Sequence, residues 1–293
     1  MSDPNHLRKD DKVAIVATAK RMEYDHQLAL DTLVSWGLVP VMGKHPLKHA
    51  GYFAGTDQEK LDDLHWALND PEIKAIIFLR GGYGTSKIID QVDFASFRDQ
   101  PKWLVGFSDL TAMILQLDVF GIPMIHGPMC VLIGKNNPSD LALKKLLFGS
   151  DTIHYNCFSH TEGQASGRIV GGNLSMIYES IGAQNEIQTN GNILFLEDVG
   201  EQMYGIDRMM TKLKRIGKLN ELSGVVLGSF TSIGNVNDYF TESIEELIIS
   251  YIPEGIPIAT SLNAGHEEEN LSLMMNKHCE VLISQNNLQI SYL

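Results

Sequence analysis

Three polar side chains stand directly after apolar runs that are typical of β-strands: Ser108, Glu197 and His266. A serine hydroxyl becomes a good nucleophile when a base removes its proton, and the base in turn needs a group that orients it. Serine, histidine and a carboxylate can fill these three roles. Because α/β proteins collect functional groups on the loops after strands, the three residues predict acyl transfer to a serine.

Ser108 lies where the apolar run 103–107 gives way to a helical run. A nucleophile elbow needs this place, since a sharp turn exposes the hydroxyl and brings backbone N–H groups close to it. The N–H of Asp109 is positioned to donate to a developing oxyanion, and the glycine backbone at Gly81 and Gly82 can approach the same site closely. The alternative is a serine that merely caps the following helix.

The other two residues also have ordinary alternatives. His266 stands on a glycine-containing loop, where a solvated histidine is common. Glu197 closes an apolar run, and burial of a carboxylate there is costly unless the group is paired. It could instead cap the segment after Gly200, a role that Asp198 or Glu201 would fill equally well.

Several familiar motifs are not met. The glycine-rich run 80–86 lacks the third glycine of a dinucleotide site and the spacing of a P-loop. The run 266–270 lacks the second histidine of HExxH, and 106–110 lacks the second glycine of G-x-S-x-G. The cysteines are widely spaced without a CxxC pair, which favours reduced structural thiols: Cys130, Cys157 and Cys279. We therefore predict no metal and no cofactor.

Composition narrows the class of protein further. The 293 residues include 23 Lys and Arg against 36 Asp and Glu, a formal net charge of −13. This acidity, without a basic stripe, argues against a nucleic-acid partner. No apolar stretch is long enough to cross a membrane, and the polar first residues lack the apolar core of a signal peptide. We therefore expect a cytoplasmic protein with no membrane partner.

The first half of the chain alternates strand and helix signals, which predicts right-handed βαβ units and a parallel sheet. Residues 56–59 have the spacing of a helix capping box. The expected strands are 12–18, 39–42, 73–79 and 103–107, and the expected helices are 21–36, 58–68 and 110–119.

The second half predicts a smaller α/β unit after a polar, turn-rich stretch. We expect helices at 173–181, 204–216 and 242–252, and strands at 193–197, 225–230, 256–260, 281–284 and 288–292. The predicted fold class is thus α/β with two domains. A Rossmann-like parallel-sheet domain covers 1–156, a linker 157–167, and a C-terminal α/β domain 168–293.

Six short motifs, in this order, resemble those of the LD-carboxypeptidase family of serine peptidases, which also contains microcin C immunity proteins. They are Arg80-Gly-Gly-Tyr-Gly84, Gly106-Phe-Ser-Asp-Leu-Thr111, His126-Gly-Pro-Met129, Gly171-Gly-Asn-Leu174, Leu196-Glu-Asp-Val-Gly-Glu201 and Gly265-His266. The resemblance runs from about Val13 to His266, nearly the whole chain. One departure is Ala17-Thr18-Ala19, where many relatives have Ala-Pro-Ser, and it bears on substrate specificity.

The resemblance implies a triad of Ser108, Glu197 and His266, with an oxyanion hole formed by the N–H groups of Gly82, or alternatively Gly81, and of Asp109. It also implies a homodimer of two-domain subunits, with the active site in the cleft between the domains and no metal. The implied activity is release of D-alanine from murein tetrapeptide in the bacterial cytoplasm, a step of peptidoglycan recycling.

An exopeptidase must also recognise a terminal carboxylate, for which Arg80 and Arg208 are candidates because arginine binds carboxylates bidentately. Tyr83 and His126 are further candidates for substrate contact. Two other functions stay open. One is a microcin-type immunity peptidase that hydrolyses an aminoacyl-nucleotide amide, and the other is a non-catalytic small-molecule binding protein on the same fold.

Overall fold

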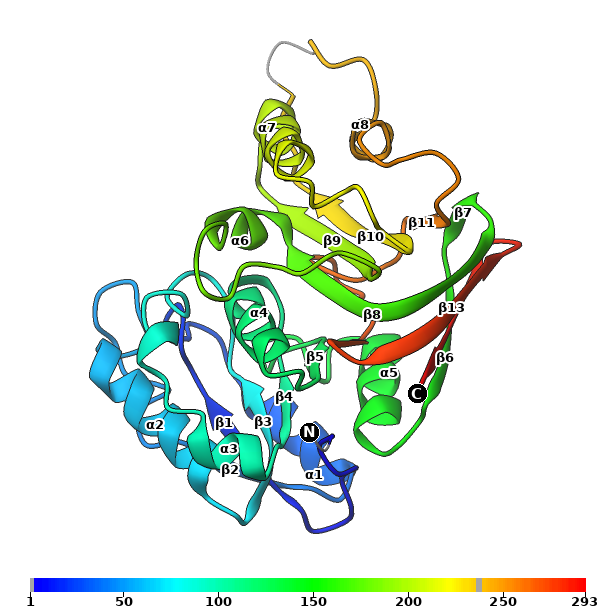
Figure 1. Ribbon diagram of the computed structural model, residues 1–293. Coiled ribbons are helices and arrows are strands. Elements are labelled where there is room, and N and C mark those ends of the chain that lie inside the picture. Colours follow the sequence, from blue (N-terminus) through cyan, green and yellow to red (C-terminus); the bar gives the residue numbers. More distant parts are fainter. Residues whose placement is uncertain (1–2, 236–238) are drawn as a thin grey trace. The chain divides into compact units, whose positions relative to one another are not determined.

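The computed structural model describes residues 3–235 and 239–293, which divide into two compact units (Figure 1). Unit 1 comprises Met1–Ser150 together with Leu271–Met274, and unit 2 comprises Asp151–Asn270 together with Met275–Leu293. The first unit therefore takes its last segment from far along the chain. This return was not predicted.

The linker predicted over 157–167 is wrong, because these residues form β7 (Phe158–Thr161) and the beginning of β8 (Gly163–Asn173). A strand with one face in solvent is polar at alternate positions, so its sequence can look like a loop. Gly167 also serves the sheet rather than a turn, since a Cβ there would clash with the carbonyl oxygen of Gly191. The units divide earlier, after Ser150.

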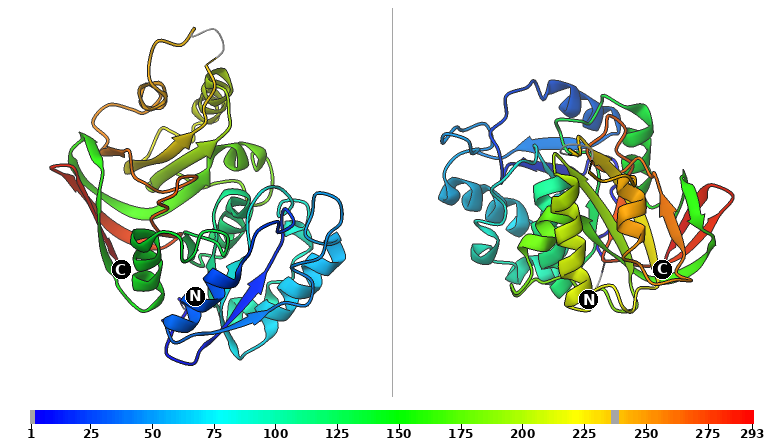
Figure 2. Two further views of the ribbon diagram at one scale, coloured as in Figure 1. Left: turned by 180° about the vertical axis from the view of Figure 1, so that it is seen from behind. Right: turned by 90° about the horizontal axis from the view of Figure 1, so that it is seen from above.

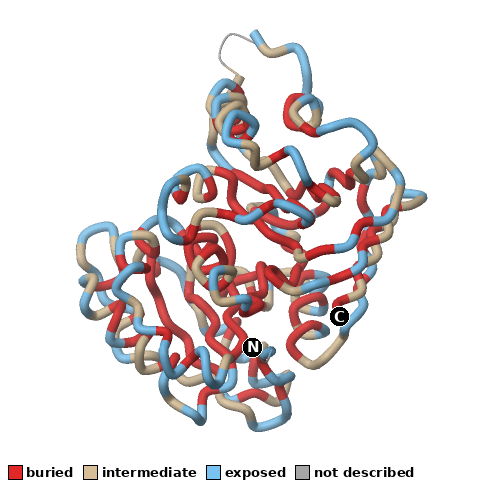
Figure 3. Tube along the Cα trace, in the orientation of Figure 1, coloured by how far each residue is buried: buried red, intermediate tan, exposed pale blue. Residues whose placement is uncertain are grey.

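Unit 1 is built on a six-stranded sheet in the order β12-β5-β4-β3-β1-β2. The pairs β1–β2, β1–β3, β3–β4 and β4–β5 are all parallel, which confirms the parallel sheet. The strands are β1 (Lys12–Val16), β2 (Val39–Met42), β3 (Ile73–Phe78), β4 (Trp103–Val105), β5 (Met124–His126) and β12 (Leu273–Met275). Their apolar side chains form the core, and β3 is fully buried from Ala75 onwards. Figure 3 marks the buried stretches of the chain in red.

The helices of unit 1 are α1 (Gln27–Ser35), α2 (Asp57–Asn69), α3 (Ala95–Asp99), α4 (Thr111–Val119) and α5 (Asn137–Leu147), with 3₁₀ turns η1 (Ile89–Gln91) and η2 (Ser108–Leu110). The capping box of α2 is present: the Thr56 side chain accepts from the N–H of Glu59, whose side chain accepts from the N–H of Thr56. The first helix begins six residues later than predicted. Residues before it pair with a neighbouring loop instead, and the N–H of Arg21 donates to the Tyr52 oxygen at 3.0 Å.

Unit 2 is built on an eight-stranded sheet in the order β6-β14-β13-β8-β9-β10-β11-β7 (Figures 1 and 2). Strands β8 to β11 are parallel, while the remaining pairs are antiparallel. The remaining strands are β6 (Thr152–Asn156), β9 (Ile193–Val199), β10 (Gly224–Thr231), β11 (Ile258–Thr260), β13 (His278–Ser284) and β14 (Asn287–Tyr292). The helices are α6 (Leu174–Glu179), α7 (Met203–Arg215) and α8 (Ile244–Ile249). All the elements predicted after residue 168 are present, with shifted ends.

Parallel pairing places the candidate residues of unit 1 together. The strands β1, β3, β4 and β5 run in one direction, so the loops that follow them share one edge of the sheet. Arg80 to Gly84 follow β3, Ser108 follows β4, and His126 ends β5. No helix in the part of the chain that the structure describes is both long and apolar enough to span a membrane.

Candidate active site

Ser108 occupies a strained turn directly after β4. Its φ is +64°, in the left-handed region that costs a non-glycine residue about 1–2 kcal/mol. Leu110 holds the N-cap position of α4, and Phe107 that of η2, so Ser108 does not sit where the capping alternative requires it. A strained serine at a strand-to-helix turn is the local geometry of a nucleophile elbow.

The glycine loop after β3 lies against this serine. A Cβ at Gly81 would lie 3.2 Å from the Cβ and 3.3 Å from the Oγ of Ser108. Gly82 has a φ of +122°, and a Cβ there would lie 2.7 Å from the Cβ of Lys20. At Gly82 the φ and the contact with Lys20 both disfavour any other residue, while a Cβ at Gly81 would fit only tightly against Ser108.

Asp109 fixes the two segments relative to each other through its side chain. The carboxylate is 1% exposed and accepts hydrogen bonds from the N–H of Thr85 at 2.8 Å and of Gly84 at 3.3 Å. Burial raises the pKa of this carboxyl, and the hydrogen bonds from Thr85 and Gly84 oppose the rise. The sequence predicts only a backbone role for Asp109, and this side-chain anchor is an addition to it. The available signal was an acidic residue within the apolar run that surrounds Ser108.

The other candidates of unit 1 lie around the same edge. Arg80 is largely buried, with its side chain 18% exposed, and its guanidinium lies over the ring of Tyr24 at 5.8 Å. Tyr83 is half exposed, with its ring 6.0 Å from that of Phe53. His126 is fully buried, and its ring centroid lies 5.6 Å from that of Phe107.

Unit 2 holds a carboxylate–imidazole pair. Nδ1 of His266 lies 2.8 Å from Oε2 of Glu197, whose side chain has no solvent exposure, while that of His266 is 20% exposed. Burial raises the pKa of Glu197, and the hydrogen bond and charge of His266 act in the opposite direction. The carboxylate therefore engages the imidazole through Nδ1.

The loop that carries His266 is shaped around this carboxylate. Gly265 has a φ of +139°, and a Cβ there would lie 2.9 Å from Oε2 of Glu197. Its N–H donates to Oδ1 of Asn270 at 2.9 Å, and Oγ1 of Thr231 donates to the carbonyl oxygen of His266 at 3.3 Å. These contacts orient the imidazole toward Glu197.

The alternative role for Glu197, a cap for the segment after Gly200, is not seen, because the N-cap of α7 is Gln202, whose side chain makes no capping hydrogen bond. Asp198 accepts at 2.9 Å from the N–H of Ser175, in the first turn of α6, and at 2.9 Å from Nδ2 of Asn173. The Asn173 side chain in turn accepts from the N–H of Met176 and caps α6. The two adjacent carboxylates therefore have different roles, one at a helix end and one on the histidine.

The candidates thus fall into two groups. Unit 1 holds Ser108, Asp109 and the glycine loop with Arg80, Tyr83 and His126, and unit 2 holds Glu197 and His266. Arg208 is exposed on α7, with its guanidinium 5.4 Å from the ring centre of Tyr204.

Metal binding and thiol chemistry would each need suitable side chains. Among residues 3–235 and 239–293, no three His, Cys, Asp or Glu side chains gather as metal ligands. Burial raises the pKa of the Cys130 and Cys279 thiols to about 12, so neither forms a thiolate at neutral pH.

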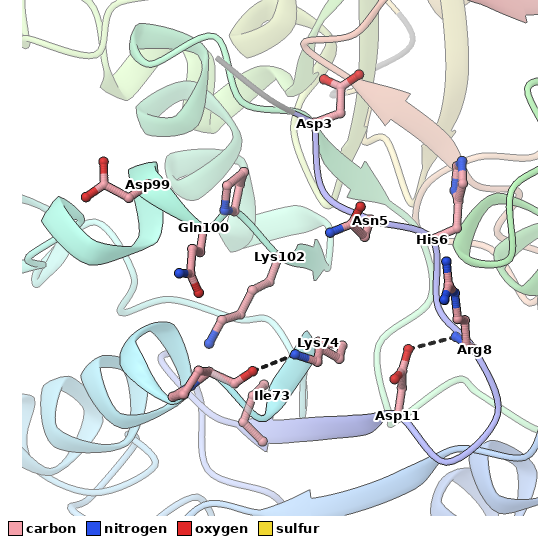
Figure 4. Close-up of a pocket in the computed structure, with 12 residues that line it drawn as sticks. Asp3, Asn5, His6, Arg8, Asp11, Ile73, Lys74, Asp99, Gln100 and Lys102 are labelled. Atoms are coloured by element: carbon pink, nitrogen blue, oxygen red, sulfur yellow. Dashed lines mark hydrogen bonds between the residues drawn. The ribbon is translucent and has the colours of Figure 1, made fainter.

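A cavity of about 500 Å³ lies at the opposite edge of the unit 1 sheet, where the strands begin (Figure 4). Lys102 reaches it from the start of β4, and its Nζ donates to the carbonyl oxygens of Ala67, at 2.8 Å, and of Asp70. These carbonyls lie at the end of α2, so the lysine stabilises the end of a helix. Burial lowers its pKa to about 8.

Comparisons with known proteins cover both units. Residues 13–127 match the family model of the LD-carboxypeptidase N-terminal domain, and residues 166–281 match that of the LD-carboxypeptidase C-terminal domain. A probable murein peptide carboxypeptidase of Bacillus subtilis is 34% identical over 279 residues, which cover 90% of this chain and 86% of that protein.

Two further proteins are similar over nearly their whole length. The murein tetrapeptide carboxypeptidase of Pseudomonas aeruginosa is 30% identical over 287 residues, 92% of each chain. The structure of the microcin C7 self-immunity protein MccF in complex with aspartyl sulfamoyl adenosine superposes with a TM-score of 0.88. It covers 99% of this chain and 98% of that one at 19% identity, which is a likeness of fold.

Proposed function

Since the chain belongs to the LD-carboxypeptidase family of hydrolases, we propose that it is a serine carboxypeptidase that releases the terminal D-alanine of murein tetrapeptide. The observation that carries this proposal is the presence of two features, one in each unit. In unit 2, buried Glu197 pairs with His266, and in unit 1, Ser108 has a φ of +64° and lies against Gly81. The two relatives named as murein carboxypeptidases support the choice of substrate.

The proposed reaction proceeds through an acyl-enzyme. Nε2 of His266 takes the proton of Ser108 while Oγ attacks the scissile carbonyl, and Glu197 stabilises the imidazolium that forms. The N–H groups of Asp109 and of Gly82, or alternatively Gly81, donate to the oxyanion. His266 then gives its proton to the leaving amine, and water repeats the sequence to release the acyl group.

The anchored glycine loop supports this mechanism physically. Oxyanion donors lower the barrier only if they are already placed where charge develops. Asp109 supplies one proposed donor through its backbone, and its buried carboxylate holds the loop that supplies the other. The donors therefore need little reorganisation during the reaction.

Tetrapeptide hydrolysis tests the proposal. The wild-type protein should release D-alanine from a tetrapeptide that ends in D-alanine, and Ser108→Ala should lower kcat by several orders of magnitude while the fold is kept. Undiminished release by Ser108→Ala would refute the assignment of the nucleophile. Absence of release by the wild type would refute the substrate.

The alternative substrate, an aminoacyl-nucleotide amide, has the likeness of fold to MccF in its favour. A direct comparison of kcat/KM for such an amide and for the tetrapeptide separates the two, and we expect the tetrapeptide to be preferred. A non-catalytic binding protein would hydrolyse neither.

The cellular role and assembly follow from the same proposal. We place the enzyme in peptidoglycan recycling in the cytoplasm, acting as a homodimer. Light scattering coupled to size-exclusion chromatography should give a mass near twice the 32.5 kDa of the chain. A mass of one chain across the working concentration range would contradict the dimer.

A further inference from the structure

Arg80 is a guanidinium with few partners for its position. It stands two residues beyond β3 and directly precedes Gly81. Its Nη1 donates to the carbonyl oxygen of Arg21 at 3.4 Å, and its buried Nε finds no hydrogen-bond partner among the described residues. Because a guanidinium carries five N–H donors, most of its capacity is unused by these contacts.

Two further cations lie beside it, and all three face one carboxylate. Glu23 is 3.1 Å from Nη2 of Arg21, 3.3 Å from Nζ of Lys20 and 4.0 Å from Nη1 of Arg80. Hydrogen bonds from Arg21 and Lys20 lower the pKa of Glu23, so the carboxylate is ionised at neutral pH. Three positive charges against one negative charge leave a local excess of two positive charges.

This cluster, defined as Lys20, Arg21, Glu23 and Arg80, adjoins the serine through the glycine loop. The N–H of Lys20 donates to the carbonyl oxygen of Gly81 at 3.4 Å. The Cβ of Lys20 lies 2.7 Å from where a Cβ of Gly82 would stand, and a Cβ of Gly81 would stand 3.3 Å from the Oγ of Ser108. The cations therefore begin at the same loop that contacts the nucleophile.

The length of one substrate residue favours a cation close to the nucleophile of an exopeptidase. The terminal carboxylate is one residue beyond the scissile carbonyl, and successive Cα atoms are about 3.8 Å apart. A receptor for that carboxylate must therefore lie within about one residue length of the nucleophile. A chain with a formal net charge of −13 needs local positive charge to accept an anionic substrate.

We propose that Arg80 and Lys20 form the receptor for the terminal carboxylate of the substrate, and that Glu23 is the internal counter-ion with which this carboxylate competes. The inference rests on the proposed carboxypeptidase function. The planar fork of Arg80 supplies bidentate hydrogen bonds, and Lys20 supplies a second positive charge. Glu23 is only partly buried, with its side chain 36% exposed, and exposed ion pairs are weak enough to exchange.

The test compares a tetrapeptide that ends in a free D-alanine carboxylate with the same peptide ending in D-alaninamide. Arg80→Gln should lower kcat/KM for the free acid about 10- to 100-fold, mainly through KM, and lower it for the amide less than threefold. Lys20→Ala should act in the same direction more weakly. Arg80→Lys should fall between wild type and Arg80→Gln, because it keeps the charge and loses the fork.

Glu23→Gln should have the opposite effect. Removal of the competing carboxylate should lower KM for the free acid and leave KM for the amide unchanged. Arg98→Gln is the matched control, because Arg98 is an exposed arginine over an aromatic ring, on α3 at the other edge of the sheet. This variant should leave kcat/KM unchanged for both substrates.

Each result decides the inference. If Arg80→Gln and Lys20→Ala lower kcat/KM equally for the acid and the amide, or lower it for neither, the carboxylate receptor is overturned. Release of D-alanine by the wild type would still uphold the proposed function in that case. A KM for the acid that does not fall in Glu23→Gln would overturn the role of Glu23. A wild type that releases no D-alanine would overturn the function and this inference together.

Discussion

Glu197 has no solvent exposure, and its Oε2 lies 2.8 Å from Nδ1 of the His266 imidazole. Removing a carboxylate from water disfavours its ionised form, and the contact with His266 offsets part of that cost. Such an arrangement is expensive for stability, so it favours a role in chemistry over a role in folding. The proposed role is to hold the Nδ1–H tautomer of His266 and stabilise its charged form.

Glu197→Gln tests that role at the scale of one residue. The amide keeps the shape of the side chain but loses the charge and can present an N–H₂ group to Nδ1, which favours the wrong tautomer. We expect kcat for D-alanine release to fall about 10³- to 10⁴-fold at pH 7, with a smaller change in KM. A fall of less than tenfold would contradict the assigned partner of His266.

A second prediction concerns the residue before the histidine. Gly265→Ala would place a methyl group about 2.9 Å from Oε2 of Glu197, at a φ that already disfavours alanine. We expect kcat to fall at least about tenfold, because the imidazole moves relative to the carboxylate.

Gly182→Ala is the matched control for this change. Gly182 also has a positive φ, +89°, but a Cβ there would meet nothing within 4 Å. It should cost about 1–2 kcal/mol of stability and leave kcat unchanged. Equal effects of the two variants on kcat would show that backbone strain, and not the contact with Glu197, explains the loss.

At the scale of single residues, the sequence indicated which residues belong to the candidate site better than it indicated their contacts. The placement of Ser108 and His266 on the loops after β4 and β11 could be inferred from local runs of apolar residues, whereas Glu197 lies inside β9 and not after it. The anchor formed by the Asp109 side chain could not, because it bonds residues 24 and 25 positions earlier. Likewise, the cluster around Glu23 unites residues from two loops that only the folded sheet brings together.

At the scale of elements, Lys102 links the start of β4 to the end of α2. Its pKa is about 8 in the folded protein against the 10.5 of an ordinary lysine, because burial disfavours the charged form. Between these values the unfolded chain binds more protons than the folded one, so stability rises with pH. Well below pH 8 Lys102 is charged in the folded protein, so burial of that charge lowers the free energy of unfolding by its full amount.

Lys102→Met tests this assignment. Relative to the variant, the wild type should gain up to about 3 kcal/mol in free energy of unfolding between pH 7.5 and 10.5, measured by urea titration. The difference between the two proteins cancels the other groups that titrate in this range. A difference that is constant with pH, or that falls, would contradict the lowered pKa.

The prediction of strands was wrong where solvent exposure gives a strand many polar residues. The sequence predicts a linker where β7 and the beginning of β8 lie, because alternate polar residues and glycines are shared by loops and half-exposed strands. The buried strands β3 and β9, which are apolar at nearly every position, were predicted to within two residues. Burial on both faces therefore decided which strands the sequence revealed.

At the scale of the whole molecule, the two units are not successive segments of the chain. The strand β12 joins the sheet of unit 1 beside β5, although it follows most of unit 2 in sequence. Such a short strand carries no local periodicity, and its pairing is non-local, so it could not be predicted from the sequence.

A fragment ending at Ser150 should therefore be incomplete. It would lack β12 and leave β5 as an unpaired edge with apolar residues exposed. We expect fragment 1–150 to aggregate or to unfold at lower urea concentration than unit 1 does in the full chain, followed by circular dichroism. A fragment with the urea midpoint of the full chain would show that β12 is dispensable for this sheet.

Reaction of the protein with a fluorophosphonate probe tests the central claim, that Ser108 is activated by His266 and Glu197. Mass spectrometry of the digested adduct should place one phosphonyl group on Ser108 in the wild type. Labelling should be lost in Ser108→Ala and strongly slowed in His266→Ala, whose urea midpoint serves as the check on folding. Modification of another residue, or labelling of Ser108 at an unchanged rate in His266→Ala, would contradict the account.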